Sequence, residues 1–177
     1  IPTCSIQMDA GKILVSNAKR SVGTVTVSSA LKAGPFMSDF SSWGPTPDLR
    51  LRPEITAHGG EITSAVAGGY DIYSGTSMAA PNMAGAIALL RQHLKNTTSL
   101  TGKELNALVN QVLMSTATIA LNEDGNPYSP RKQGAGLAGI KNAIESEGYI
   151  TVKDAGGNVL DKTKVELLDD KKRTGVY

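Results

Sequence analysis

The chain has 177 residues, 40% of them hydrophobic and 19% charged, a balance typical of a folded domain rather than of a disordered chain. Its 18 Lys and Arg against 16 Asp and Glu leave a net charge of +2, and only 5% of the residues are aromatic, which argues against a nucleic-acid or membrane-surface partner. No apolar stretch approaches the roughly 20 residues of a membrane span. Cys4 is the only cysteine, so neither an internal disulfide nor a cysteine-ligated zinc site can form.

The two ends of the sequence indicate a segment of a larger protein. The chain begins at Ile1 with neither an initiator Met nor a signal-peptide pattern. It ends at Tyr177, in what looks like the start of another strand. We therefore expect both ends to be cuts within a longer chain.

The first part of the sequence predicts short strands joined by glycine-rich loops. Residues 3–6 predict a strand and residues 13–15 a short helix, and Val22–Val27 alternates β-branched with small residues, as a strand does. Between Gly34 and Tyr73, Gly-Pro and Gly-Gly pairs mark loops, and apolar pieces of strand length cover residues 54–57 and 62–67. Long loops within a compact domain are commonly functional.

The second part predicts helices. Residues 77–94 are apolar on every face of the first four turns, so this helix should be buried, and Pro81 should fall near its first turn, where a missing N–H is tolerated. Residues 105–116 have amphipathic spacing, preceded by a capping box at Thr101 and Glu104. The remaining predicted elements are a turn at 122–126, an extended glycine-braced segment at 128–137, a short helix at 140–146, and strands at 151–152 and 165–167.

The sharpest local feature is Gly75-Thr76-Ser77-Met78-Ala79-Ala80-Pro81, where a glycine-rich loop meets the predicted buried helix. A helix N-terminus has unpaired N–H groups and the positive end of the helix dipole, which stabilise negative charge. Acyl-transfer enzymes need such donors beside their nucleophile, so Ser77 is a candidate nucleophile. The alternative is that Ser77 is only an N-cap, the common role of serine at this position.

These residues resemble the nucleophile motif of the subtilisin-like serine proteases. Further segments match in order: Phe40-Ser41-Ser42-Trp43-Gly44-Pro45 and Arg52-Pro53-Glu54-Ile55-Thr56-Ala57-His58-Gly59-Gly60. The segment from Tyr128 to Leu137 is similar to that of the large cell-envelope group that includes lactocepin and C5a peptidase. The resemblance covers nearly the whole chain and is densest at residues 36–144.

The resemblance implies an α/β fold: the C-terminal part of a subtilisin-like domain, with a mostly parallel sheet, flanking helices and a buried nucleophile helix. It further implies three regions. Residues 1–20 would be the tail of a protease-associated insert, 21–148 the C-terminal part of the catalytic domain, and 149–177 the start of a fibronectin-type β domain.

The family mechanism needs an Asp, a His and an oxyanion-hole Asn besides the nucleophilic Ser. The family order places all three upstream of the insert, outside this chain. His93 follows Ser77 by 16 residues on the same predicted helix, roughly 24 Å away, so it cannot be the base. His58 stands where the family usually has proline; it is either an alternative base or, as its setting favours, a solvated loop histidine.

The other candidate residues have simpler interpretations. Asp9, in Asp-Ala-Gly, fits the closing turn of the insert better than a catalytic aspartate, and Asp39 fits a local cap or turn. Asn82 replaces a family histidine that is not the catalytic base. It is expected on the helix, five residues after Ser77, and not in an oxyanion hole. The carboxylate pairs 123–124 and 169–170 fit solvated turns and charge runs. No phosphate-binding or calcium-binding loop is present, so no metal and no cofactor is expected.

The resemblance therefore predicts a segment of a secreted or wall-anchored serine endopeptidase. It carries the nucleophile Ser77 without its base and should be inactive alone. Its partners would be a protein or peptide substrate in the parent, and the upstream part of the same domain or a second copy. The alternatives are a non-catalytic structural or interaction module, and a pseudo-protease in the intact protein.

Overall fold

The computed structural model describes Lys12 and residues 34–166. The chain divides into two units, residues 1–33 and 34–177, and only the second is described at length. The elements predicted at 3–6, 13–15 and 22–27 lie outside the described residues, as do Asp9 and the pair 169–170.

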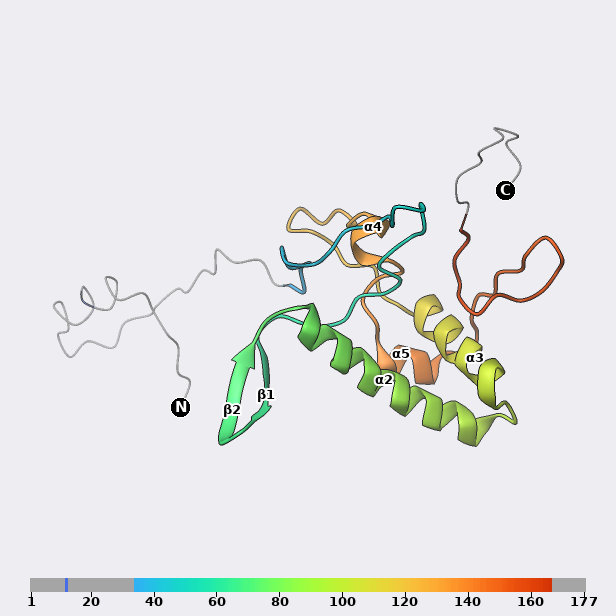
Figure 1. Ribbon diagram of the computed structural model, residues 1–177, viewed down its shortest axis with the longest axis horizontal. Coiled ribbons are helices and arrows are strands. Elements are labelled where there is room, and N and C mark those ends of the chain that lie inside the picture. Colours follow the sequence, from blue (N-terminus) through green and yellow to red (C-terminus); the bar gives the residue numbers. More distant parts are fainter. Residues whose placement is uncertain (1–11, 13–33, 167–177) are drawn as a thin grey trace, which may run out of the picture. The chain divides into compact units, whose positions relative to one another are not determined.

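Three helices form the core of the second unit (Figure 1). They are α2 (Thr76–Thr97), α3 (Gly102–Ser115) and α5 (Ile140–Glu145), and each contacts the other two. The i, i+3, i+4 spacing of α3 places its apolar side chains on one face, as predicted. The buried cluster consists of Leu90, Leu108, Val109, Val112, Leu113 and Ala143. Thr101 occupies the N-cap of α3 as expected, but its side chain makes no capping hydrogen bond.

The long helix α2 exists as predicted, but within the described residues it is not buried on all faces. Leu90 is its one buried residue, whereas Leu89 is 58% exposed. Met83, Ile87, Leu90 and Leu94 of α2 pack in the cluster with α3 and α5, whereas among the described residues the side of α2 that carries Leu89 is left open. Pro81 is the sixth residue of α2, beyond the predicted first turn, so the carbonyl of Ser77 lacks the N–H that would bond to it in an uninterrupted helix.

The regular strands form a two-stranded antiparallel sheet at the N-terminal end of α2 (Figure 1). β1 (Ile62–Val66) was predicted; β2 (Gly69–Tyr73) was missed, because its glycine pair was taken as loop. The two pair from Ile62 with Tyr73 to Val66 with Gly69. The expected parallel pairing is limited, among the described residues, to one isolated bridge between Thr56 and Leu137.

The segment 128–137 is not fully extended, because it contains the short helix α4 (Pro130–Gln133). Ser129 caps this helix by accepting the N–H of Arg131 at 3.3 Å, and Pro130 follows at the first helical position. The Ser-Pro pair was therefore a helix-start signal that the sequence analysis overlooked. The predicted turn at 122–126 is confirmed by the Asn122 N–H to Asn126 carbonyl bond and by the Leu121–Pro127 bridge.

The strands predicted near the C-terminus do not form among the described residues: residues 151 and 152 are not in a strand, and the pairing found nearby joins other residues. Lys153 and Val159 form an antiparallel bridge around a turn at residues 154–157. Residues 165 and 166 are not in a strand, and residue 167 lies outside the described range.

Candidate active site

Ser77 lies in the exposed first turn of α2, as its second residue. The N-cap is Gly75, and no side chain makes a capping hydrogen bond at this end. The interpretation of Ser77 as an N-cap is therefore wrong, because Gly75 holds that position. The amides of Met78 and Ala79 donate to the Gly75 carbonyl at 3.0 and 3.3 Å. The Ser77 N–H comes before them in the first turn of α2, where no helical carbonyl lies four residues earlier to accept it.

The loop at residues 58–60 packs against this turn. The Gly75 N–H donates to the Gly59 carbonyl at 2.8 Å. Gly59 is buried, and a Cβ there would lie 2.6 Å from the Gly75 carbonyl oxygen and 3.0 Å from the Ala79 Cβ. The close approach of these two backbones thus requires glycine at position 59 and fixes where α2 begins.

A pocket of ≈ 230 Å³ lies beside the turn. Its walls combine the segment 35–41, the loop 56–60 and the start of α2, and they include Phe36, Phe40, Ala57, His58, Thr76 and Ala79. Thr76 faces this pocket, whereas Ser77 does not line it. The arrangement can therefore offer an apolar recess one residue away from the candidate nucleophile.

The described residues do not assemble a catalytic set around Ser77. His58 is exposed at the pocket wall, and no hydrogen bond among the described residues joins it to Ser77. Asp39 and Asn82 are exposed, and His93 lies far along α2. The part of the chain that the structure describes contains no cluster of three His, Cys, Asp or Glu able to hold a metal, and none of its helices is long and apolar enough to cross a membrane.

Gln133 is a buried polar residue whose role the sequence analysis missed. The residue is 3% exposed. Its side chain donates to the Tyr128 carbonyl at 2.6 Å and accepts the Ala120 N–H at 2.7 Å. Its own carbonyl accepts the Thr56 hydroxyl at 3.0 Å. Gln133 therefore ties the segment 120–128 to the strand-like piece that leads to His58 and Gly59.

Gly134 explains why the same segment is rich in glycine. It has φ +64, and a Cβ there would lie 2.4 Å from the carbonyl carbon and oxygen of Glu54. The Ala135 N–H donates to that same carbonyl at 3.0 Å. Both the backbone conformation and the close approach thus require glycine at this position.

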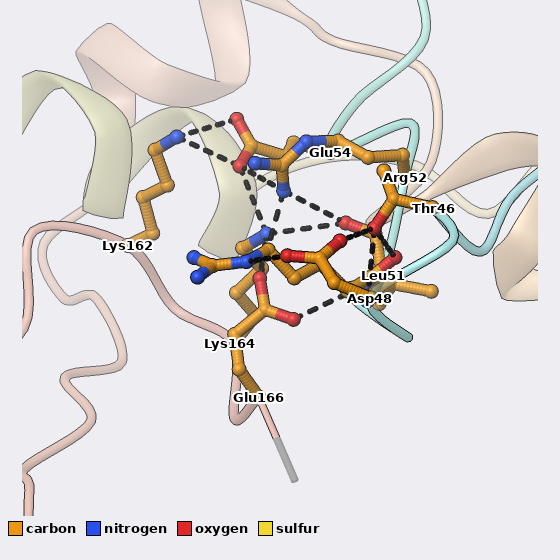
Figure 2. Close-up of polar contacts among 9 residues, drawn as sticks. Thr46, Asp48, Leu51, Arg52, Glu54, Lys162, Lys164 and Glu166 are labelled. Carbon is orange, nitrogen blue, oxygen red and sulfur yellow. Dashed lines mark hydrogen bonds and ion pairs between the residues drawn. The ribbon is translucent and has the colours of Figure 1, made fainter. Parts of the chain in front are cut away.

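A network of charged side chains joins residues 51–54 to residues 162–166 (Figure 2). The Glu54 carboxylate accepts Lys162 at 2.7 Å, Arg52 at 2.8 Å and Lys164 at 2.9 Å. Glu166 accepts the Leu51 N–H at 3.0 Å and also pairs with Lys164. Burial raises the pKa of Glu54, but the hydrogen bonds from Lys162 and Lys164 outweigh it, so the pKa lies below its ordinary value.

Comparison with known proteins confirms the family resemblance. The Subtilase family profile matches residues 9–136, which include the Gly75–Pro81 turn, the 52–60 loop and most of the 128–137 segment. The chain belongs to the subtilase family. The described helices and small sheet are compatible with an α/β fragment of a subtilisin-like domain.

The relatives are long bacterial peptidases. C5a peptidase of Streptococcus pyogenes serotype M3 is 38% identical over 179 residues, covering 97% of this chain and 15% of the relative. The serotype M6 C5a peptidase is 39% identical, covering 87% of this chain and 13% of the relative. The PII-type proteinase of Lactococcus lactis subsp. cremoris is 43% identical over 121 residues, covering 62% of this chain and 6% of the relative. The chain thus spans about 15% or less of the length of these relatives.

Proposed function

We propose that this chain is the C-terminal part of the catalytic domain of a secreted or cell-wall serine endopeptidase, with Ser77 as its nucleophile. The observation that carries the proposal is that Ser77 is exposed in the first turn of α2 and makes no capping bond. Family membership and the peptidase names of the relatives support it.

In this mechanism the Ser77 Oγ attacks the carbonyl carbon of the scissile peptide bond while a base removes the hydroxyl proton. The Ser77 N–H, in the positive first turn of α2, donates to the oxyanion that forms. Collapse of this intermediate breaks the C–N bond, the leaving amine takes the proton, and an acyl-enzyme remains. Water then hydrolyses the ester and regenerates Ser77.

The base, its orienting aspartate and the second oxyanion donor belong, in this proposal, to chain outside these residues. Ser77 has no hydrogen-bonded histidine among the described residues, and a serine hydroxyl without a base is a weak nucleophile near neutral pH. The missing part of the domain would pack on the open side of α2, where Leu89 is 58% exposed. Peptide substrates would therefore be cleaved only by the complete domain.

Labelling with a fluorophosphonate probe tests this proposal. The 177-residue chain alone should not be labelled, whereas the longer natural protein should be, and Ser77→Ala should abolish that labelling. Ser64→Ala is the control, because Ser64 is an exposed serine on β1 outside the turn. Labelling of the isolated chain that Ser77→Ala removes would reveal a base within it, with His58 first in line. If neither the 177-residue chain nor the longer natural protein is labelled at Ser77, the intact protein is a pseudo-protease.

A second candidate is a non-catalytic interaction module. The hairpin favours it, because Tyr70 and Ile72 are 80% and 60% exposed on β2. Exposed apolar side chains of this kind favour association with a partner or a second copy. Size-exclusion chromatography of the chain and of a variant with Tyr70→Ser and Ile72→Ser separates the two candidates. Self-association that these substitutions abolish would favour an interaction module that acts through the hairpin, whereas self-association that they leave unchanged would fit a segment whose α2 lacks its covering part.

A further inference from the structure

Residues 150–166, which we call the strap, lie beyond the family match, yet they bond to the rest of the second unit at three places. The Ile150 N–H donates to the Ser115 hydroxyl at 2.9 Å, at the end of α3. The Leu160 carbonyl accepts the Gln111 side chain at 2.6 Å, and Gln111 is only 4% exposed. The end of the strap then joins the charged network around Glu54 (Figure 2). The strap is thus held along its length rather than leading away as a free linker.

The charged end of the strap is partly shielded from water. The Lys164 side chain is 8% exposed and the Glu54 side chain 25%. Lys164 bonds to the Leu51 carbonyl at 3.1 Å as well as to both carboxylates. Removing one member of a shielded ion pair costs much more than breaking an exposed surface pair, because the remaining charge loses its partner.

Glu54 also stands at the start of the segment that supports the nucleophile turn. Its carbonyl accepts the Ala135 N–H, and Thr56 bonds to Gly136 and Ala138 at 2.8 and 2.9 Å. Three residues further, the Gly59 carbonyl accepts the Gly75 N–H. The segment 54–59, which is hydrogen-bonded at Glu54, Thr56 and Gly59, therefore connects the charged network to the turn that contains Ser77.

We propose that the strap orders the Gly75–Ser77 turn through Glu54, which acts as a positioning residue. The strap accordingly belongs to the same folded unit as Ser77, although it lies beyond residue 136, where the family match ends. Ordering of the turn does not depend on whether Ser77 is a nucleophile, so this inference and the proposed function fail separately.

Hydrogen exchange of the Gly75 amide, which donates to Gly59, tests the inference in the full chain. Deleting the strap risks loss of the whole fold, so the test uses Glu54→Gln and Lys164→Met, with Glu145→Gln as the control. Glu145 pairs with Lys141 on the exposed face of α5, at 4.0 Å. We expect exchange at Gly75 to accelerate about tenfold in the first two variants relative to Glu145→Gln, and by a larger factor than exchange at the core amides of α3, which follows global stability.

Two results would overturn the inference. In one, Glu54→Gln and Lys164→Met leave the Gly75 amide as protected as Glu145→Gln does. In the other, the Gly75 and α3 amides accelerate by the same factor, which would mean that the strap stabilises the whole unit and does not order the turn. Probe labelling of Ser77 does not enter this readout.

Discussion

Replacing Gly59 with alanine should disrupt the start of α2 while leaving its length and apolar pattern unchanged. The new Cβ would lie 2.6 Å from the Gly75 carbonyl oxygen and 3.3 Å from the Ala79 nitrogen. That oxygen accepts the first N–H groups of α2, so it cannot move without loss of those bonds. Inserting a methyl group into such a close contact typically costs about 1–3 kcal/mol of folding free energy.

Gly60→Ala is the matched control for this change. A Cβ at Gly60 would meet only the Ser38 Oγ, at 3.7 Å, an ordinary contact. Since alanine also reduces the entropy of the unfolded chain, Gly60→Ala should leave stability unchanged or raise it by about 0.4–1 kcal/mol.

Thermal unfolding followed by far-UV circular dichroism measures both variants. For a chain of this size, each kcal/mol shifts Tm by about 2–4 °C, so Gly59→Ala should melt several degrees below the unmodified chain and Gly60→Ala should not. A Gly59→Ala variant that melts at the same temperature as the unmodified chain would refute the close approach of residues 59 and 75. An equal loss in both would show that the loop tolerates no side chain anywhere, for a reason other than this contact.

Three further predictions concern stability. Leu90→Ala should cost about 2–5 kcal/mol, because Leu90 is fully buried in the three-helix cluster, whereas Leu89→Ala should cost almost nothing in urea titrations of the same chain. Gln133→Ala should leave the Ala120 N–H and the Tyr128 carbonyl without their partner, at a cost of about 1–3 kcal/mol for each group. A urea midpoint equal to that of the unmodified chain would contradict the role given to this side chain. Burial raises the pKa of Glu54, but Lys162 and Lys164 outweigh this effect and hold the pKa below the ordinary 4.5, so the contribution of Glu54 to stability is complete above that pH and is lost as the pH falls through the lowered value. The loss of stability as the pH falls from neutral to below 4.5 should be smaller in Glu54→Gln, and an identical pH profile in this variant would refute the assignment.

The sequence alone determined the features that depend on neighbouring residues. The spacing of Leu105, Leu108 and Val112 fixed α3 and its buried face, because a helix repeats every 3.6 residues whatever packs against it. The turn at 122–126 followed from its Asn and Gly residues, and the Gly75–Pro81 motif identified the family.

Only the tertiary structure decided how the site is built. Ser77 is the second helical residue and not the cap, because a bond from Gly75 to the distant Gly59 sets where α2 begins. The network around Glu54 joins positions more than a hundred residues apart, and no local pattern in the sequence encodes such a pairing. The burial of α2 differed from expectation for the same reason: the sequence pattern shows which faces are apolar, but the elements that cover a face come from parts of the chain that are distant in sequence.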